Sequence, residues 1–267
     1  MEEEKYIKAI EANPSIIKMI PNPTDEMKLL ALKKDGLVLE YIKEPTREME
    51  ERAVGSNPRA IKFVKEPTEE MMIKAVNKGW NILEYIKNPT DQVLKLAINQ
   101  AGWAIQYVKN PSIELQLLAV RKNYDAIKYI KEPDESVQEE AVKVSYDALR
   151  YIHKPSPQIE RLAIKQNEAA IGFITSLDQQ KRLELLKINI LVIKYIVKDI
   201  RREDLEEVLK EVLSKEEVEE KYVRDFLNCS TIDKYCITEG MDKMLLIYKY
   251  GSQKAKKIAV DEKLKRL

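Results

Sequence analysis

Hydrophobic and polar positions along this chain repeat every 22 residues. Prolines keep that step without an insertion, at Pro23, Pro45, Pro67, Pro89, Pro111, Pro133 and Pro155. Eight residues after each proline stands an alanine: Ala31, Ala53, Ala75, Ala97, Ala119, Ala141 and Ala163. Four residues before the same positions runs a column that is aromatic after its first member: Met19, Tyr41, Phe63, Tyr85, Tyr107, Tyr129, Tyr151, Phe173 and Tyr195. Such strict self-similarity predicts a repeat architecture.

Each repeat is predicted to hold two short helices. At the start of the first helix, Asn88 can cap and Pro89 suits the first helical position. The apolar residues that follow have the spacing of one helical face, at Val93, Leu96, Ala97 and Ile98. The second helix carries Ala104, Ile105, Tyr107 and Val108. Asn57-Pro58 and Asn13-Pro14 lie where this second helix would begin, as a cap followed by proline.

Helices this short are marginal in water, so each must pack on its neighbours. We therefore expect an all-α fold, a right-handed-type α-solenoid of two-helix 22-residue repeats with a C-terminal helical module. The small alanine column lets adjacent helices approach closely. The period is strict over residues 23–176 and worn units extend it, which predicts a solenoid over residues 1–198 and a separate helical module over residues 199–267.

The predicted C-terminal module has ordinary helix signals in place of the repeat. Ser214 with Glu217 forms a candidate capping box, Gly240 and Gly251 can end helices and Ser252 can begin the last one. The module is acidic over residues 203–220 and mostly basic over residues 254–266. It is either a cap for the repeats or a partner-binding or dimerising element.

Composition argues against binding to nucleic acid or membranes through the net charge of the whole protein. Charged residues make up 34% of the 267 residues, but the formal net charge is +1, so binding to nucleic acid or an anionic membrane would have to be local. The acidic start is not followed by a long apolar run, and no later stretch approaches a membrane span. We expect a cytoplasmic protein without membrane association.

The sequence offers little material for catalysis. His153 is the single histidine, and the only cysteines are Cys229 and Cys236, which we interpret as reduced structural thiols. A Gly-rich phosphate loop and a nucleophile with its base are absent from the sequence. We therefore predict no catalytic residue, no metal, no cofactor and no enzymatic activity.

Two rows of side chains are candidate binding surfaces. Large aromatics at or next to the start of the second helix are the candidates for protein binding: Trp80, Trp103, Tyr124 and Tyr146. Lysines two residues before successive prolines could follow a phosphate backbone: Lys43, Lys65, Lys87, Lys109 and Lys131. The alternative for the lysines is interaction with negative helix ends. The column from Tyr41 to Tyr195 is predicted to be a core ladder.

Two segments carry a resemblance to known proteins. Residues 126–133 (AIKYIKEP) and 84–90 (EYIKNPT) resemble the short helical repeats of uncharacterised phage, bacterial and large-virus proteins, which read much like IKYIKNPTEEVQLAAVKQNG. The resemblance spans residues 1–198 and brings no catalytic residues. It implies a phage-encoded protein that binds and blocks a host defence protein in the host cytoplasm, in the manner of an anti-CRISPR or another counter-defence inhibitor. A virion or assembly component is the remaining alternative.

Overall fold

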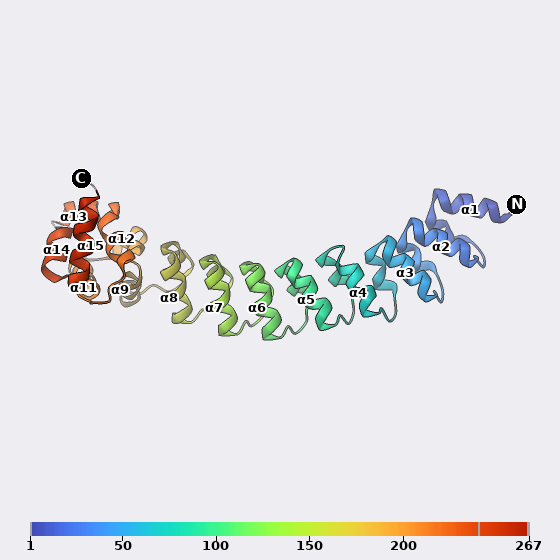
Figure 1. Ribbon diagram of the computed structural model, residues 1–267, viewed down its shortest axis with the longest axis horizontal. Coiled ribbons are helices and arrows are strands. Elements are labelled where there is room, and N and C mark those ends of the chain that lie inside the picture. Colours follow the sequence, from blue (N-terminus) through green and yellow to red (C-terminus); the bar gives the residue numbers. More distant parts are fainter. Residues whose placement is uncertain (1, 240, 266–267) are drawn as a thin grey trace. The chain divides into compact units, whose positions relative to one another are not determined.

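The computed structural model (Figure 1) describes residues 2–239 and 241–265, except for the side chains of residues 236–239. Every regular element in the described residues is a helix, and they contain no strand. The prediction of an all-α protein is therefore confirmed. The chain divides into two compact units, residues 1–140 and 141–267. The boundary predicted between residues 198 and 199 lies inside the second unit and stays a prediction.

The first unit alternates α-helices with 3-10 helices, which are labelled η. Its elements are α1 (Glu2–Ala12), η1 (Pro14–Met19), α2 (Asp25–Lys34), η2 (Gly36–Tyr41), α3 (Arg47–Ser56), η3 (Pro58–Phe63), α4 (Glu69–Val76), η4 (Trp80–Tyr85), α5 (Asp91–Gln100), η5 (Gly102–Tyr107), α6 (Ile113–Lys122) and η6 (Tyr124–Tyr129). The boundary between the units falls within α7 (Glu135–Val144).

The second unit continues the alternation and then changes to longer helices. Its elements are η7 (Tyr146–Tyr151), α8 (Pro157–Gln166), η8 (Glu168–Phe173), α9 (Gln179–Ile188), η9 (Ile190–Val192), α10 (Ile193–Ile196), η10 (Val197–Asp199), α11 (Arg202–Leu213), α12 (Glu220–Asn228), α13 (Ser230–Glu239), α14 (Lys243–Tyr250) and α15 (Gln253–Leu264).

The second helix is a six-residue 3-10 helix in the repeats from η1 to η8, for example η6. In the next repeat the three-residue η9 is followed directly by α10. In η6 the buried residues are Ala126 and Ile127. Ile130, which follows the helix with extended backbone at φ −97° and ψ 116°, is buried as well. Aliphatic side chains of η6 and of the residue after it therefore face the core.

The α-helices begin two residues later than the sequence predicted. In α5 the cap is Thr90, whose hydroxyl accepts the backbone N–H of Val93 at 3.4 Å, and Pro89 precedes the cap. The prediction that Asn88 caps and Pro89 opens the helix is wrong. The residue directly after the proline has a hydroxyl that accepts a free N–H of the first turn. The helix therefore begins after this residue, and the proline belongs to the preceding connection. Thr24, Thr46, Thr68, Ser112 and Ser156 cap in the same way.

The predicted caps of the second helix are confirmed. Asn57 precedes Pro58 at the start of η3, and its side-chain oxygen accepts the N–H of Arg59 at 3.1 Å. Asn13 does the same before Pro14, with the N–H of Ser15 at 3.1 Å. Proline at the first position of these helices loses no hydrogen bond, because its nitrogen would have no intrahelical partner.

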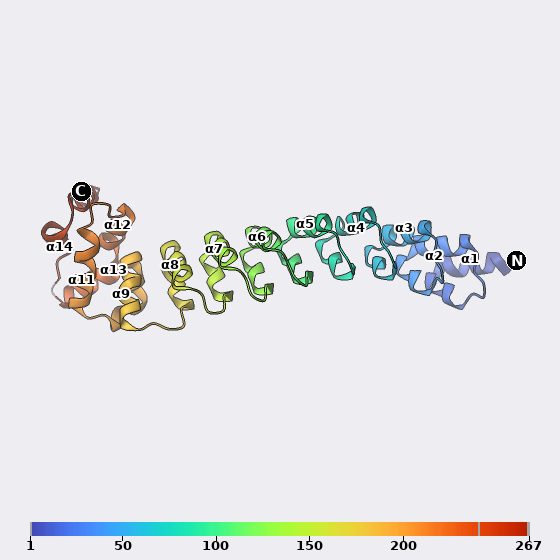
Figure 2. The ribbon, with the colours of Figure 1, turned by 90° about the horizontal axis from the view of Figure 1, so that it is seen from below.

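The first unit has two rows of helices, one of α-helices and one of 3-10 helices, as Figure 2 shows for its blue to green part. Consecutive α-helices pack on each other from α1 to α6, and consecutive 3-10 helices pack on each other from η1 to η6. Ala97 lies in the core of this packing with no exposed surface, as do Ala31, Ala53 and Ala119. The expectation that the alanine column allows close helix packing fits this burial.

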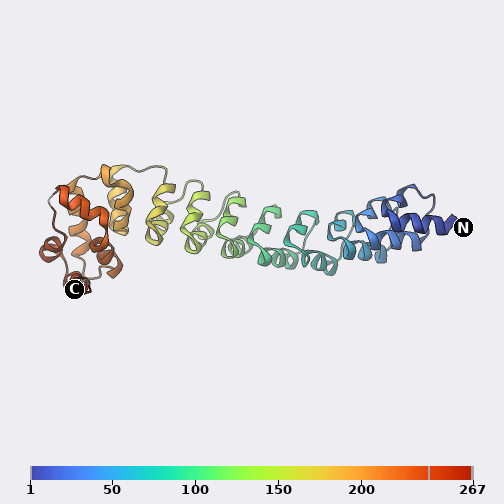
Figure 3. The ribbon, with the colours of Figure 1, turned by 90° about the horizontal axis from the view of Figure 1, so that it is seen from above.

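The last five helices of the second unit pack as a cluster without the 22-residue repeat. Helix α15 contacts α12 and α14, and α11 contacts α9 and α14 (Figure 3, orange and red ribbons). The hydroxyl of Tyr222 in α12 donates to the carbonyl of Leu186 in α9 at 2.9 Å. Burial of this hydroxyl raises the pKa of Tyr222, so it stays a neutral donor.

Two of the predicted signals in this cluster are confirmed, and Gly240 lies outside the described residues. Gly251 follows the end of α14, and Ser252 caps α15 by accepting the N–H of Ala255 at 3.2 Å. The capping box at Ser214 is wrong. Ser214 ends α11 instead, and its hydroxyl donates to the carbonyl of Glu211 at 3.2 Å.

Candidate binding surface

The aromatic column lies at the surface of the 3-10 helices, and the prediction of a core ladder is wrong. Tyr41 is 44% exposed, Tyr129 41% and Tyr195 55%, and the other rings of the column are half-buried. Tyr129 ends η6 between the buried Ile127 and the buried Ile130, and its ring is turned toward solvent.

Tyrosines of the neighbouring repeats affect the ionisation of Tyr107. Burial raises the pKa of Tyr107, and the nearby Glu84, Tyr85 and Tyr129 raise it further, since each disfavours a second negative charge. Tyr85, Tyr107 and Tyr129 come from three successive repeats. The column therefore forms a row of phenol rings along the first unit.

Two of the predicted protein-binding residues meet in a cluster. The ring of Trp80 in η4 lies 6.5 Å from that of Trp103 and 6.2 Å from that of Tyr107, both in η5. These are favourable distances for tilted aromatic pairs. Trp103 is 37% exposed, and Trp80 and Tyr107 are half-buried. The three rings therefore pack on one another, and Trp103 remains partly exposed to solvent.

The indole of Trp103 is held in place by a carboxylate. Its N–H donates to Asp125 at 2.8 Å, and Lys128 pairs with the same carboxylate at 2.9 Å. Partial burial opposes ionisation of Asp125, but the hydrogen bonds from Lys128 and Trp103 prevail and lower its pKa. Asp125 therefore stays ionised and fixes the orientation of the ring.

The other two predicted aromatics lie outside this cluster. Tyr124 is half-buried at the start of η6. In the second unit, Tyr146 stacks on Phe173 with ring centroids 6.4 Å apart and an interplanar angle of 23°. The guanidinium of Arg150 lies 4.8 Å from the centroid of the same Phe173 ring.

Cations lie over the exposed rings of the first unit. The ammonium of Lys18 is 5.4 Å from the centroid of Tyr41, that of Lys128 is 5.0 Å from Tyr129, and the guanidinium of Arg59 is 5.9 Å from Tyr85. Cation–π attraction holds such charges against the ring faces. The surface therefore combines aromatic area with positive charge.

The predicted lysine row lies beside the aromatic column. Lys87 follows the buried Ile86, whose backbone is extended at φ −99° and ψ 118°. Tyr85 and Lys87 therefore flank one buried residue. Lys43, Lys65, Lys87, Lys109 and Lys131 are all exposed. We call these lysines, the rings from Tyr41 to Tyr129, Trp80 and Trp103 the aromatic–lysine face.

Sequence reasoning missed that the aromatic column belongs to this face. A signal was available, because the Ile or Val after a ring already supplies a buried residue in most repeats, as Ile42, Val64 and Ile86 do. With only six residues in a 3-10 helix, a second large core column has no room.

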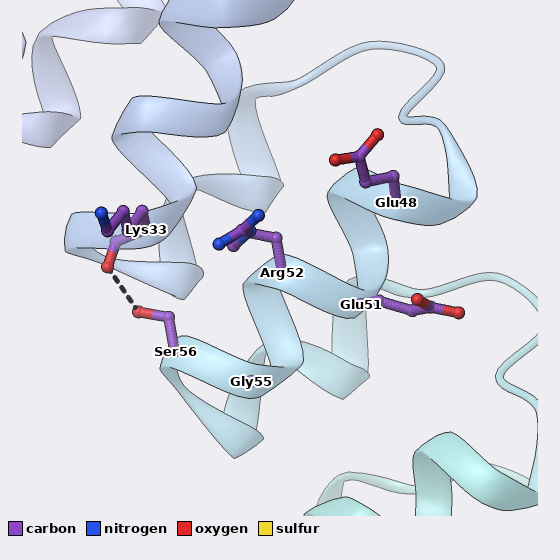
Figure 4. A pocket seen from close by; sticks show the side chains of 6 residues that line it. All are labelled: Lys33, Glu48, Glu51, Arg52, Gly55 and Ser56. Carbon is purple, nitrogen blue, oxygen red and sulfur yellow. Dashed lines mark hydrogen bonds between the residues drawn. The ribbon is translucent and has the colours of Figure 1, made fainter.

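The opposite row, the α-helices, bears shallow grooves. Figure 4 shows one between α2 and α3, an open space of about 500 Å³ lined by Lys33, Glu48, Glu51, Arg52, Gly55 and Ser56. Arg52 turns toward α2, Glu51 points away from it, and the Ser56 hydroxyl donates to the carbonyl of Lys33 at 3.2 Å. A similar groove lies between α4 and α5. These grooves lack the enclosure of a small-molecule site.

Side chains that could take part in catalysis or bind a metal lie apart from one another. His153 is exposed, Cys229 is buried as a free thiol, and the side chain of Cys236 lies outside the described residues. Within residues 2–239 and 241–265, no three His, Cys, Asp or Glu side chains are grouped to hold a metal ion. Of the helices in this part of the chain, none has the length and apolarity to cross a membrane.

Comparison of the chain with protein-family models, curated proteins and solved structures finds no match.

Proposed function

We propose that this chain is a non-enzymatic protein-binding scaffold whose repeats stack as a right-handed-type α-solenoid and bind through the aromatic–lysine face. The stacking of consecutive helices within each unit supports the solenoid arrangement. We further propose that the protein is encoded by a phage and blocks a host defence protein. The resemblance of the repeats is the support for both of these proposals.

The exposed cluster of Trp80, Trp103 and Tyr107 carries the proposal. Tyr107 belongs to the aromatic column, in which a ring is repeated although buried aliphatic side chains already fill the interior. Trp and Tyr are also the side chains that most often dominate the energy of protein interfaces. The cluster is large, held by Asp125 and partly in water. These properties fit a surface on which a partner buries an anchor residue.

Affinity capture with a surface-matched control tests this assignment. The tagged full chain is expressed in candidate host cells as wild type, as Trp80→Ala/Trp103→Ala and as Met244→Ala/Tyr248→Ala, which changes an exposed pair on α14. We expect a protein in stoichiometric amount with the wild type and the α14 variant, and its loss with the tryptophan variant. Circular dichroism checks that all three are folded.

The opposite outcomes would overturn the proposal. Loss of the partner only with the α14 variant would place binding on the C-terminal helices instead of the aromatic–lysine face. Recovery of nucleic acid in place of protein would favour the second candidate, phosphate-backbone binding, which the exposed lysine row supports. In that case affinity would fall steeply with salt.

A further inference from the structure

The aromatic–lysine face presents the same pair of groups at each step along the first unit. Every repeat from Tyr41 to Tyr129 contributes one ring and, two residues later, one lysine. The 3-10 helices of successive repeats pack on each other, and packed helices lie about 8–10 Å apart, so we take this as the interval from one ring and lysine to the next. A partner that uses the whole face must therefore repeat its own contacts at that interval.

Among regular peptide conformations, polyproline II matches this interval. Its rise of about 3.1 Å per residue and three residues per turn bring equivalent side chains back every 9.3 Å or so. A β-strand returns to the same face after about 6.7 Å. Two turns of an α-helix advance about 11 Å, which loses register within a few repeats. Polyproline II segments also dock naturally into grooves lined by aromatic rings.

Charge on the face indicates which segment would fit. Lys87 and Lys109 are followed by Asn88 and Asn110, whereas Lys43, Lys65 and Lys131 are followed by glutamates. In the described part of the chain, no ion pair involves Lys87 or Lys109. Glu84 is the single acid within η4 and η5. Asp125 at the tryptophan cluster is paired with Lys128, so Lys87 and Lys109 leave an excess of positive charge in these repeats.

We infer that the aromatic–lysine face binds an acidic segment of a partner protein in the polyproline II conformation, one turn per repeat, centred on Trp80, Trp103, Lys87 and Lys109. The rings of Trp80, Trp103 and Tyr107 contact the apolar positions of the segment, and the lysines pair with a carboxylate in each turn. This inference rests on the proposed function, because it names the chemistry of the protein partner.

Tryptophan fluorescence reports directly on the site, since Trp80 and Trp103 are the two tryptophans of the chain. The full chain is titrated with a peptide of five Pro-Pro-Glu triplets, with a peptide of five Pro-Pro-Lys triplets, and with ten prolines followed by five glutamates. A fifteen-nucleotide oligothymidine is the fourth probe. We expect saturable binding of the Pro-Pro-Glu peptide, about tenfold weaker binding of the block peptide and no binding of the lysine peptide.

Variants separate the site from general electrostatics. Lys87→Gln/Lys109→Gln should weaken binding of the Pro-Pro-Glu peptide about tenfold, the combined effect of two exposed charge pairs. Lys34→Gln/Lys122→Gln is the matched control, because these exposed lysines end α2 and α6 in the other row of helices. That control should change the affinity less than about twofold. An unchanged melting temperature shows that each variant is folded.

Three results would overturn the inference. Equal affinity for the triplet and block peptides would mean that charge alone attracts the ligand, without the turn-by-turn register. Tighter binding of oligothymidine would assign the face to nucleic acid. Absence of a fluorescence change with every peptide at millimolar concentration would exclude this ligand. If captured protein still depends on Trp80 and Trp103, the proposed function stands in each case and only the ligand class fails.

Discussion

The repeats of the first unit and the helices α11 to α15 of the second unit reach stability by different means. In the repeats, each stabilising contact occurs again 22 residues along: a threonine or serine cap, a buried alanine and a buried aliphatic stripe. In the C-terminal helices the contacts are single. Tyr222 donates to Leu186, and the buried Lys243 donates to two carbonyls of the preceding segment.

This difference teaches where a substitution should matter. Neighbouring repeats make the same contacts, so the unfolding free energy of the repeats is close to a sum of similar terms. A cluster of unlike helices depends on a few side chains that have no substitute. Large rings are also used differently, because Phe226 is fully buried in α12 whereas Phe63 is half-exposed at the end of η3.

The largest expected effect comes from comparing these two phenylalanines. Phe226→Ala leaves a cavity in the C-terminal core and should cost about 3–5 kcal/mol of unfolding free energy. Phe63→Ala removes a half-exposed ring and should cost about 1 kcal/mol. Urea denaturation followed by circular dichroism measures both. Equal costs would mean that the aromatic column contributes to a core after all.

A second test removes the buried cation of the C-terminal helices. The ammonium of Lys243 donates at 3.1 Å to the carbonyls of Leu227 and of Cys229 and pairs with Asp233 at 2.7 Å. Lys243→Met leaves these carbonyls without their charged donor and should cost about 1.5–3 kcal/mol. The exposed Lys254→Met is the control and should be near neutral. A stable Lys243→Met protein would show that the cluster tolerates the loss of a single contact, as the repeats are expected to do.

Within the repeats, overpacking of the alanine column should have a comparable or smaller effect. Ala97→Leu adds bulk at a position with no exposed surface and should cost about 1–3 kcal/mol. Asn99→Leu, on the exposed side of the same helix, tests whether added bulk alone is responsible. A shift of the melting temperature that is the same for both variants would contradict the assigned register.

The smallest expected effect is a pH response at the tryptophan cluster. The pKa of Asp125 is lowered in the folded chain, so its ionised form stabilises the fold above the unfolded-state pKa of about 3.9, and this contribution disappears as the pH falls through the folded-state value. Solvent screening limits the effect to less than about 1 kcal/mol. Emission of Trp103 should change in this acid range in the wild type and not in Asp125→Asn. The same acid transition in both proteins would exclude Asp125 as its origin.

Much of the helix pattern was predictable because it depends on local rules. The alanine column and the caps at Asn13 and Asn57 follow from short-range sterics and hydrogen bonding, and the structure agrees with them. The cap of α5 was misplaced because Asn88 and Thr90 flank the same proline and both can cap. Local propensity does not choose between two such residues. Which hydroxyl or amide meets the first N–H groups depends on where the neighbouring repeat positions the helix.

The sequence by itself determined that the chain is helical, that its repeat is 22 residues long and that its alanines and aliphatic residues are interior. Only the tertiary structure decided which way the aromatic column faces. The reason is the end of the 3-10 helix at Tyr129, after which the extended backbone of Ile130 turns the next side chain into the core and leaves the Tyr129 ring in solvent. The candidate binding surface exists because of that change of backbone conformation.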